Sequence, residues 1–307
     1  MEKLKAQRTR EVLRAVRQVE LKTRRQVEDQ LAGRYRAAFK GRGTSFADVR
    51  EYVRGDEVRA IDWNVTARTG APHVKTFAEE RELTLLLMID MSASGAYGSG
   101  RSSKRELAAE AASALAFSAI RNDDKVGLLL FTDRVELYLA PRRGHAHVLR
   151  VIREVLFFTP EGRRTDLAPA LDHANRVLKR RALVLLVSDF LLAGPIDHTV
   201  GALRRKLKTT NRRHDVVAVS VTDPRERRLP DIGVITLEDA ETGEQIEIDT
   251  SSEKAREAYR RAADRYYAEV GRSIGASGVD QLHLSTAEPY LPVLIAFLGR
   301  RRARRAP

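Results

Sequence analysis

The sequence of 307 residues contains no cysteine and no long apolar segment. The absence of cysteine excludes disulfides, thiolate metal ligands and cysteine nucleophiles. The first thirty residues are highly charged and lack the apolar core of a signal peptide. Every apolar run is also shorter than the roughly 18 residues of a membrane-spanning helix. We therefore expect a cytoplasmic protein with no transmembrane segment, and a chain long enough to bury a sizeable core.

The middle of the chain lacks any excess of positive charge, although the net charge is +13. Residues 1–50 carry 14 Lys/Arg and 6 Asp/Glu, residues 300–305 carry five arginines, and residues 51–299 hold 36 of each sign. The basicity therefore lies at the two ends. Basic ends bind nucleic acid, acidic lipid or an acidic partner, or they are simply solvated. Since no nucleic-acid-binding motif accompanies them, nucleic acid is not the expected partner.

Common catalytic signatures are missing or incomplete. The segment from Gly98 to Ser103 lacks the third glycine of a dinucleotide fingerprint, and Ser103-Lys104 reverses the order required in a phosphate loop. The Gly-x-Ser-x-Gly pattern at Ser273 lies within the helix expected to end near Ile274 and not at a strand-to-helix elbow. The sequence therefore predicts neither an enzyme of these classes nor a small-molecule substrate.

Strand-like and helix-like segments alternate from about residue 83. Strands are expected at 83–89, 126–131, 135–139, 183–187, 216–221 and 280–284, and helices at 103–122, 144–157, 167–180, 196–208 and 291–298. This alternation predicts an α/β fold with a doubly wound, mostly parallel sheet and helices on both faces. The three-residue link at 132–134 requires one antiparallel pair. If the strand order is 3-2-1-4-5-6, the first strand lies beside the fourth.

The segments before and after this alternating region have other expected structures. A basic helix is expected over residues 2–31, followed by a loop-rich segment to about residue 70. Residues 234–238 and 245–248 form an expected hairpin, and Thr250 and Glu253 have capping-box spacing for a helix to about Ile274. We divide the chain into a basic helix and loop segment at 1–78, an α/β domain at 79–299 and a basic tail at 300–307.

Oxygen-bearing side chains follow two of the buried strands. Asp90, Ser92 and Ser94 come directly after the first strand, Asp189 follows the fourth, and Thr165 lies on a loop between them. Two carboxylates with neutral hydroxyls favour Mg2+ or Mn2+, and such a site keeps open positions. The alternative is that these residues make turns and helix caps, with Thr165 capping the helix that follows it.

These residues resemble the metal-ion-dependent adhesion site (MIDAS) of von Willebrand factor A domains. Gly41–Phe46 and the stretch from Arg50 to Trp63 resemble the hallmark of the bacterial "domain of unknown function 58" family, and Asp223–Glu226 and Glu241–Gly243 resemble its later motifs. The resemblance covers about residues 41–250. It implies a von Willebrand factor A-like domain with no established catalysis, and MoxR-type AAA+ ATPases or their clients as partners in chaperone-like maturation of protein complexes.

The hallmark allows two interpretations. In the first, Arg54, Asp56, Arg59 and Asp62 form an ion-pair network that locks the loop to the sheet, with Trp63 as the apolar anchor. In the second, the hallmark faces a partner. We prefer the structural interpretation, since such charges usually satisfy one another within a chain.

The expected function is a non-catalytic, metal-dependent protein-binding module that serves a MoxR-type ATPase. One alternative is a magnesium-dependent hydrolase. It has little support, because Asp166 is the only further acid near the predicted ligands in the sequence. The other alternative is a nucleic-acid-binding protein that uses its basic ends.

Overall fold

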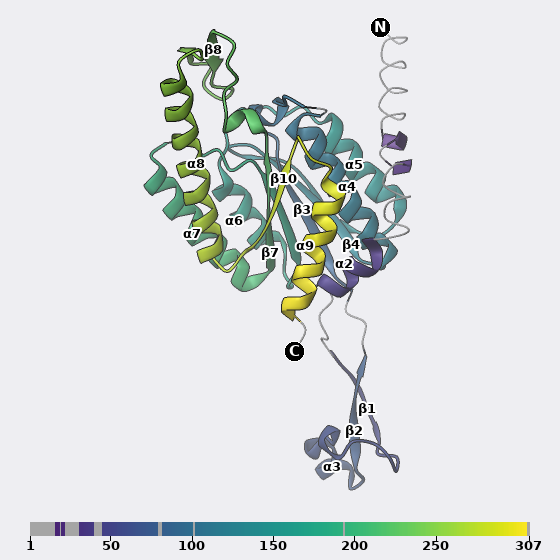
Figure 1. The fold of residues 1–307 in the computed structure, drawn as a ribbon. Coiled ribbons are helices and arrows are strands. Elements are labelled where there is room, and N and C mark those ends of the chain that lie inside the picture. Colours follow the sequence, from purple (N-terminus) through teal and green to yellow (C-terminus); the bar gives the residue numbers. More distant parts are fainter. Residues whose placement is uncertain are drawn as a thin grey trace, which may run out of the picture.

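The computed structural model describes residues 16–18, 20–21, 31–39, 45–78, 82–100, 102–192 and 194–305. Most of the helix expected at 2–31 and most of the Gly41–Phe46 motif lie outside these ranges. A six-stranded sheet forms the centre of the α/β body (Figure 1). Its strands are β3 (Thr84–Asp90), β4 (Lys125–Phe131), β5 (Val135–Arg142), β6 (Leu183–Ser188), β7 (Asp215–Thr222) and β10 (Asp280–Ser285).

The strand order is β10-β7-β6-β3-β4-β5, the doubly wound order considered from the sequence. All neighbouring strands are parallel except β4 and β5, which are antiparallel as their short link requires. The predicted fold class is therefore confirmed. Because β3 and β6 are neighbours and parallel, their carboxyl ends meet at one edge of the sheet.

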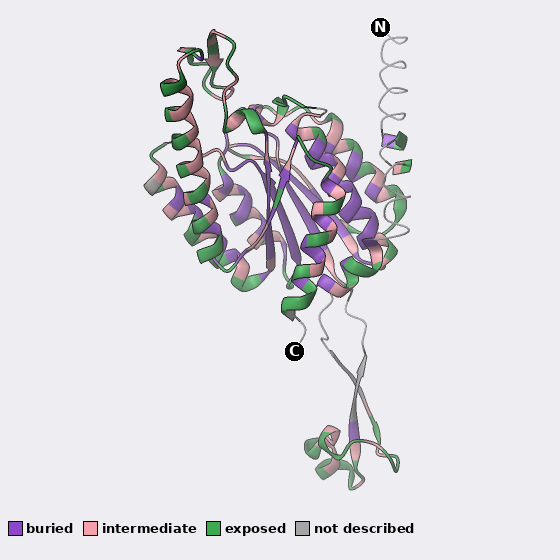
Figure 2. Ribbon diagram, viewed as in Figure 1, coloured by how far each residue is buried: buried purple, intermediate pink, exposed green. Residues whose placement is uncertain are grey.

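Helices cover both faces of the sheet, which is why the inner strands are apolar throughout. One face packs against α2 (Ala32–Phe39), α4 (Lys104–Arg121), α5 (His145–Phe157) and α9 (Tyr290–Arg305), and the other against α6 (Leu167–Val177), α7 (Ile196–Arg213) and α8 (Glu253–Ala276). Figure 2 shows buried strands between helices whose outer faces are exposed. No helix of the described residues is long and apolar enough to cross a membrane.

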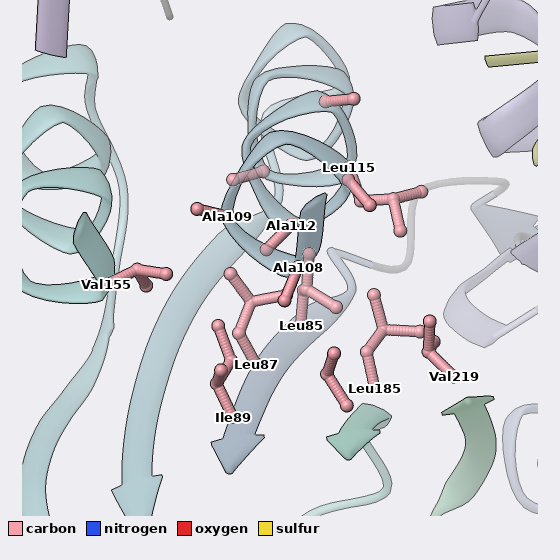
Figure 3. Packing of buried hydrophobic residues seen from close by; sticks show 14 of the residues in the cluster. Leu85, Leu87, Ile89, Ala108, Ala109, Ala112, Leu115, Val155, Leu185 and Val219 are labelled. Atoms are coloured by element: carbon pink, nitrogen blue, oxygen red, sulfur yellow. The ribbon is translucent and has the colours of Figure 1, made fainter. Parts of the chain in front are cut away.

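Helix α4 sets the position of the loop that follows β3. Its alanines, including Ala108 and Ala112, lie against Leu85 and Leu87 of β3, as Figure 3 shows. Small side chains let the helix approach the sheet closely. A capping box starts the helix: the Ser103 hydroxyl accepts from the Glu106 amide, and the Glu106 carboxylate accepts from the Ser103 amide.

Several predicted helix boundaries were wrong by a few residues. Helix α6 ends at Val177, and its cap is Asp166, whose carboxylate accepts from the Ala168 amide. The alternative of Thr165 as its cap is thus not what the structure shows. Helix α8 is capped by Ser252 and not by Thr250, whose hydroxyl instead donates to the Gly233 carbonyl.

Helix α9 is longer than expected and includes the basic segment at 300–305. Arg301 is only 1% exposed and forms ion pairs with Asp215 at the start of β7 and Asp280 at the start of β10. Its guanidinium lies 4.9 Å from the centre of the Phe39 ring. The neighbouring Arg302 is exposed. Arg301, which belongs to the apparent basic tail, therefore acts as a clamp: it connects α9 to α2 and to the starts of two strands.

The family hallmark builds a separate small unit. It comprises β1 (Ser45–Glu51), β2 (His73–Ala78), a 3-10 turn at Val58–Ala60 and α3 (Trp63–Thr69). Figure 1 shows it extending from the α/β body at the bottom of the view. Strands β1 and β2 pair antiparallel along their whole length.

The predicted ion-pair network around Trp63 was wrong for Asp56. Asp56 pairs with Arg50, at 2.6 and 2.7 Å, instead of with Arg54 or Arg59. Asp62 caps α3 by accepting from the Asn64 amide at 3.0 Å, which places Trp63 in the first helical turn with 68% of its surface exposed. Trp63 is therefore not the buried anchor that was predicted, and its exposure favours the partner-facing interpretation.

As the sole tryptophan, Trp63 reports on this unit. We expect the red-shifted fluorescence of a solvated indole that is fully accessible to acrylamide. Asp62→Ala should leave that spectrum unchanged, although it removes a helix cap worth about 1 kcal/mol. A blue-shifted spectrum protected from the quencher would contradict the exposed position.

Candidate metal site

Four of the five predicted ligands line one small recess. Asp90, Ser92, Ser94 and Asp189 enclose a space of about 20 Å3 where β3 and β6 end. Such a volume suits a single ion or a water molecule. Ser92, Ser94 and Asp189 are buried. The parallel register of β3 and β6 therefore brings together residues that are almost a hundred positions apart.

The oxygens in the recess have spacings that suit one small cation. The Ser92 and Ser94 hydroxyls are 3.1 Å apart, and the Ser94 hydroxyl donates to Asp189 Oδ2 at 2.7 Å. Neighbouring ligands of an octahedral Mg2+ lie about 3.0 Å apart, given metal–oxygen distances near 2.1 Å. The Asp90 carboxylate is oriented by the Ser92 amide at 2.9 Å and the Ser188 hydroxyl at 2.7 Å.

The fifth predicted ligand, Thr165, points to a different partner. Its hydroxyl donates to Glu241 Oε1 at 2.7 Å. Glu241 belongs to the turn of the hairpin formed by β8 (Val234–Glu238) and β9 (Gln245–Asp249). Burial raises the pKa of Glu241, and the charge of Asp189 adds to that shift. No spacing in the sequence predicts Glu241 near the site, because only the tertiary fold brings this hairpin over Thr165.

Lys104 is a second residue of the site that was not predicted from the sequence. Its ammonium is buried and lies 2.6 Å from Asp189 Oδ2, the oxygen that also accepts from Ser94. It also pairs with Glu226. The charges of Asp189 and Glu226 raise the pKa of Lys104 in spite of its burial. Lys104 therefore compensates part of the negative charge at this edge of the sheet.

A family motif holds Glu226 in position beside Lys104. Asp223 accepts from the Ser99 amide at 2.8 Å and the Ser99 hydroxyl at 2.6 Å, and it receives a further bond from Thr286. It also caps the short turn that presents Glu226. The motif Asp223–Glu226 thus fastens the loop after β7 to the loop after β3.

The Asp90 carboxylate has no ion-pair partner among the described residues. Arg105 also lines the recess, but its guanidinium donates to the Met91 carbonyl at 3.1 Å. Burial and the neighbouring charge of Asp189 raise the pKa of Asp90 to about 7. An ionised Asp90 therefore has no close ion pair like that of Asp189 with Lys104, and only the charge of Arg105 acts on it from a greater distance.

The chemistry of the donors fits a divalent cation. Asp90 and Asp189 line the recess together with two cations, Lys104 and Arg105, so an ion would replace the Lys104 ammonium beside Asp189. The described residues contain no group of three or more acidic or histidine side chains arranged to hold a metal. An ion here would depend on Asp90 and Asp189 together with neutral hydroxyl oxygens, as magnesium sites permit.

Comparisons with known proteins extend these observations. The family model described as "Protein of unknown function DUF58" matches residues 48–269. The chain is 35% identical over 292 residues to the uncharacterized protein Rv1480 of Mycobacterium tuberculosis, which covers 94% of this chain and 89% of that protein. It is 36% identical over 165 residues to the uncharacterized protein MAV169 of Mycobacterium avium, covering 53% of this chain and 93% of that protein.

Two solved structures have similar arrangements at low sequence identity. Conserved hypothetical protein BatB from Bacteroides thetaiotaomicron aligns with a TM-score of 0.45 and 14% identity, over 72% of this chain and 99% of BatB. The SpRpn10 VWA domain aligns with a TM-score of 0.41 and 11% identity, over 70% of this chain and 94% of that domain.

Proposed function

Because this chain belongs to the DUF58 family and has a von Willebrand factor A-like α/β domain, we propose that it is a non-catalytic, divalent-metal-dependent protein-binding module. Asp90, Ser92, Ser94 and Asp189 would hold Mg2+ or Mn2+, with Thr165 contributing from the adjacent loop. When bound, the ion supplies a coordination position for a carboxylate of the partner.

The observation that carries this proposal is the shared recess at the ends of β3 and β6. Its oxygens lie at the spacings of metal ligands, and the carboxylate of Asp90 has no cation of its own. The two carboxylates next to the recess, Glu226 and Glu241, are engaged within the chain. Glu226 is bonded to Lys104 and Tyr267, and Glu241 to Thr165. This favours binding over hydrolysis.

The partner that the family resemblance suggests is a MoxR-type AAA+ ATPase or a client of that ATPase. We expect the purified complex to dissociate in EDTA and to form again with Mg2+, because a carboxylate–cation contact requires the ion. Asp189→Ala should have the same effect as EDTA. Binding of the ATPase followed by biolayer interferometry measures both.

The matched control is the pair of exposed arginines Arg300 and Arg302 on α9. Replacing both with glutamine should change the salt dependence of binding and leave the EDTA effect intact. A complex that survives both chelation and Asp189→Ala would show that the ion is not the contact.

A further inference from the structure

A basic hollow lies between helices α7 and α8, which run side by side in Figure 1. Its volume is about 320 Å3, and it is lined by Arg204, Arg205, Lys208 and Ala276. It shares no lining residue with the candidate metal site. The lining therefore contains three cations and no carboxylate, although residues 51–299 as a whole carry equal numbers of both signs.

The position of the three cations is fixed by the packing of the two helices. The Ser273 hydroxyl of α8 donates to the Val200 carbonyl at 3.0 Å, and the hydroxyl of its cap residue Ser277 donates to the Arg204 carbonyl at 3.2 Å. Arg204 and Lys208 are four residues apart on α7, so both extend from the same face of that helix. The hollow is thus built on two helices that are bonded to each other.

The nearby carboxylates pair with other cations. On α6, Asp172 pairs with Lys206 at 2.6 Å, and on α8, Glu269 pairs with Arg272. Within the described part of the chain, none of the three cations of the hollow has a carboxylate within 4.0 Å or donates a side-chain hydrogen bond. Their positive charge is therefore not compensated by the protein itself.

The end of α8 does not account for these cations either. Lysine and arginine often bond to the last carbonyls of a helix. Here the Ile274 carbonyl accepts from the Ser277 amide, and the Gly275 carbonyl accepts from the Gly278 amide at 2.9 Å. The carbonyls at this helix end are thus bonded within the chain, which leaves the cations available to a ligand.

The chemistry of the lining favours phosphate over carboxylate. A single carboxylate gains little from an exposed cation, and all three of these cations are exposed. A phosphate group concentrates close to two negative charges and three acceptor oxygens, and a guanidinium binds it through two parallel hydrogen bonds. The volume lies at the lower end of the roughly 300–1,000 Å3 of small-molecule sites, which is more than one phosphate group requires.

We propose that the α7–α8 hollow binds a ligand with two or more linked or clustered phosphate groups, and that Arg204, Arg205 and Lys208 donate to its oxygens. A free nucleoside triphosphate and the headgroup of a polyphosphorylated lipid share this chemistry. The site involves neither Asp90 nor Asp189, so it stands independently of the proposed metal-dependent function.

The test is isothermal titration calorimetry of the full chain with sodium tripolyphosphate at physiological ionic strength. EDTA in the buffer keeps divalent ions away from the probe and from the metal site. We expect saturable binding to one site. The double variant Arg204→Gln, Lys208→Gln should bind at least about tenfold more weakly, which is the scale of losing one hydrogen bond to a charged group.

The matched control is the double variant Arg212→Gln, Arg213→Gln. It removes the same charge from exposed positions of the same helix, and neither residue lines the hollow. It should bind tripolyphosphate almost as the wild type does, and circular dichroism of both variants establishes that the fold is retained. An oligoglutamate of the same total charge should bind far more weakly than tripolyphosphate.

Three results would overturn the proposal: no binding of tripolyphosphate to the wild type, equal weakening in the two double variants, or equal affinity for oligoglutamate. The second and third would show a diffuse basic surface in place of a phosphate site. Titration with ATP and co-sedimentation with vesicles that contain phosphatidylinositol bisphosphate then distinguish the two sources. Binding that is lost in Arg204→Gln, Lys208→Gln alone identifies the source, and either source supports the site.

Discussion

Replacing Asp90 with asparagine is expected to weaken Mg2+ binding more than about 100-fold while the fold is retained. Loss of a residue that only supports a metal ligand already lowers the affinity for the metal by about 10–100-fold. Asp90 is itself a proposed ligand and has no other cation paired to it. Asparagine has the same shape, so the strand end is not disturbed. Isothermal titration calorimetry of both proteins with Mg2+ measures the effect, and equal affinities would remove Asp90 from the site.

The same substitution should also change how stability depends on pH when no metal is present. The pKa of Asp90 is raised from 3.8 to about 7 in the folded protein. Between pH 4 and pH 7 the unfolded chain has released a proton that the folded protein still holds. The contribution of Asp90 to stability therefore falls as pH rises through this window. Asp90→Asn should remove this fall, and so should Mg2+ in the wild type, as measured by urea unfolding in steps of pH.

Arg301→Ala should lower the free energy of unfolding by about 3 kcal/mol, the lower end of the cost of breaking a buried ion pair, because Asp280 keeps its second ion pair with Arg304. Arg301 is almost fully buried and pairs with both Asp215 and Asp280, and its guanidinium packs over Phe39. Its loss removes charge compensation at the start of two strands and loosens α9 against α2. Urea unfolding followed by circular dichroism gives the change.

Arg302→Ala is the matched control, since Arg302 is the next residue on the same helix and is exposed. Its effect should stay within about 0.5 kcal/mol, as for most surface substitutions. If both variants lose the same stability, the effect belongs to helix α9 in general and Arg301 is not a clamp.

The strands of the sheet could be predicted from the sequence because their cause is local, whereas their order was considered only as one doubly wound arrangement. Leu85–Ile89 and Leu183–Val187 are continuous apolar runs, which only a strand covered on both faces explains. The three-residue link before Val135 fixed the antiparallel edge. Once the order is known, Asp90 and Asp189 must lie at one edge of the sheet. That part of the site follows from topology.

The rest of the site depends on contacts between distant residues, which the spacing of residues in the sequence does not reveal. Lys104 reads as the first residue of a helix, and its burial between Asp189 and Glu226 arises only when three loops meet. Glu241 reads as a hairpin turn, and its bond to Thr165 spans 76 residues. Arg301 belongs to a run of arginines that the sequence suggests is solvated, yet it is buried. Trp63 belongs to a motif that the sequence suggests is packed, yet it is exposed. In each case the deciding partner comes from a distant element.

The most direct test of the metal site is a crystal grown with Mn2+ and measured at the manganese absorption edge. An anomalous peak about 2.1 Å from oxygens of Asp90, Ser92, Ser94 and Asp189 is the predicted result, with the Lys104 ammonium moved away from Asp189. The contradicting result is a crystal with no anomalous peak in the recess and with Lys104 still bonded to Asp189. The four oxygens would then form a charge network completed by the chain itself.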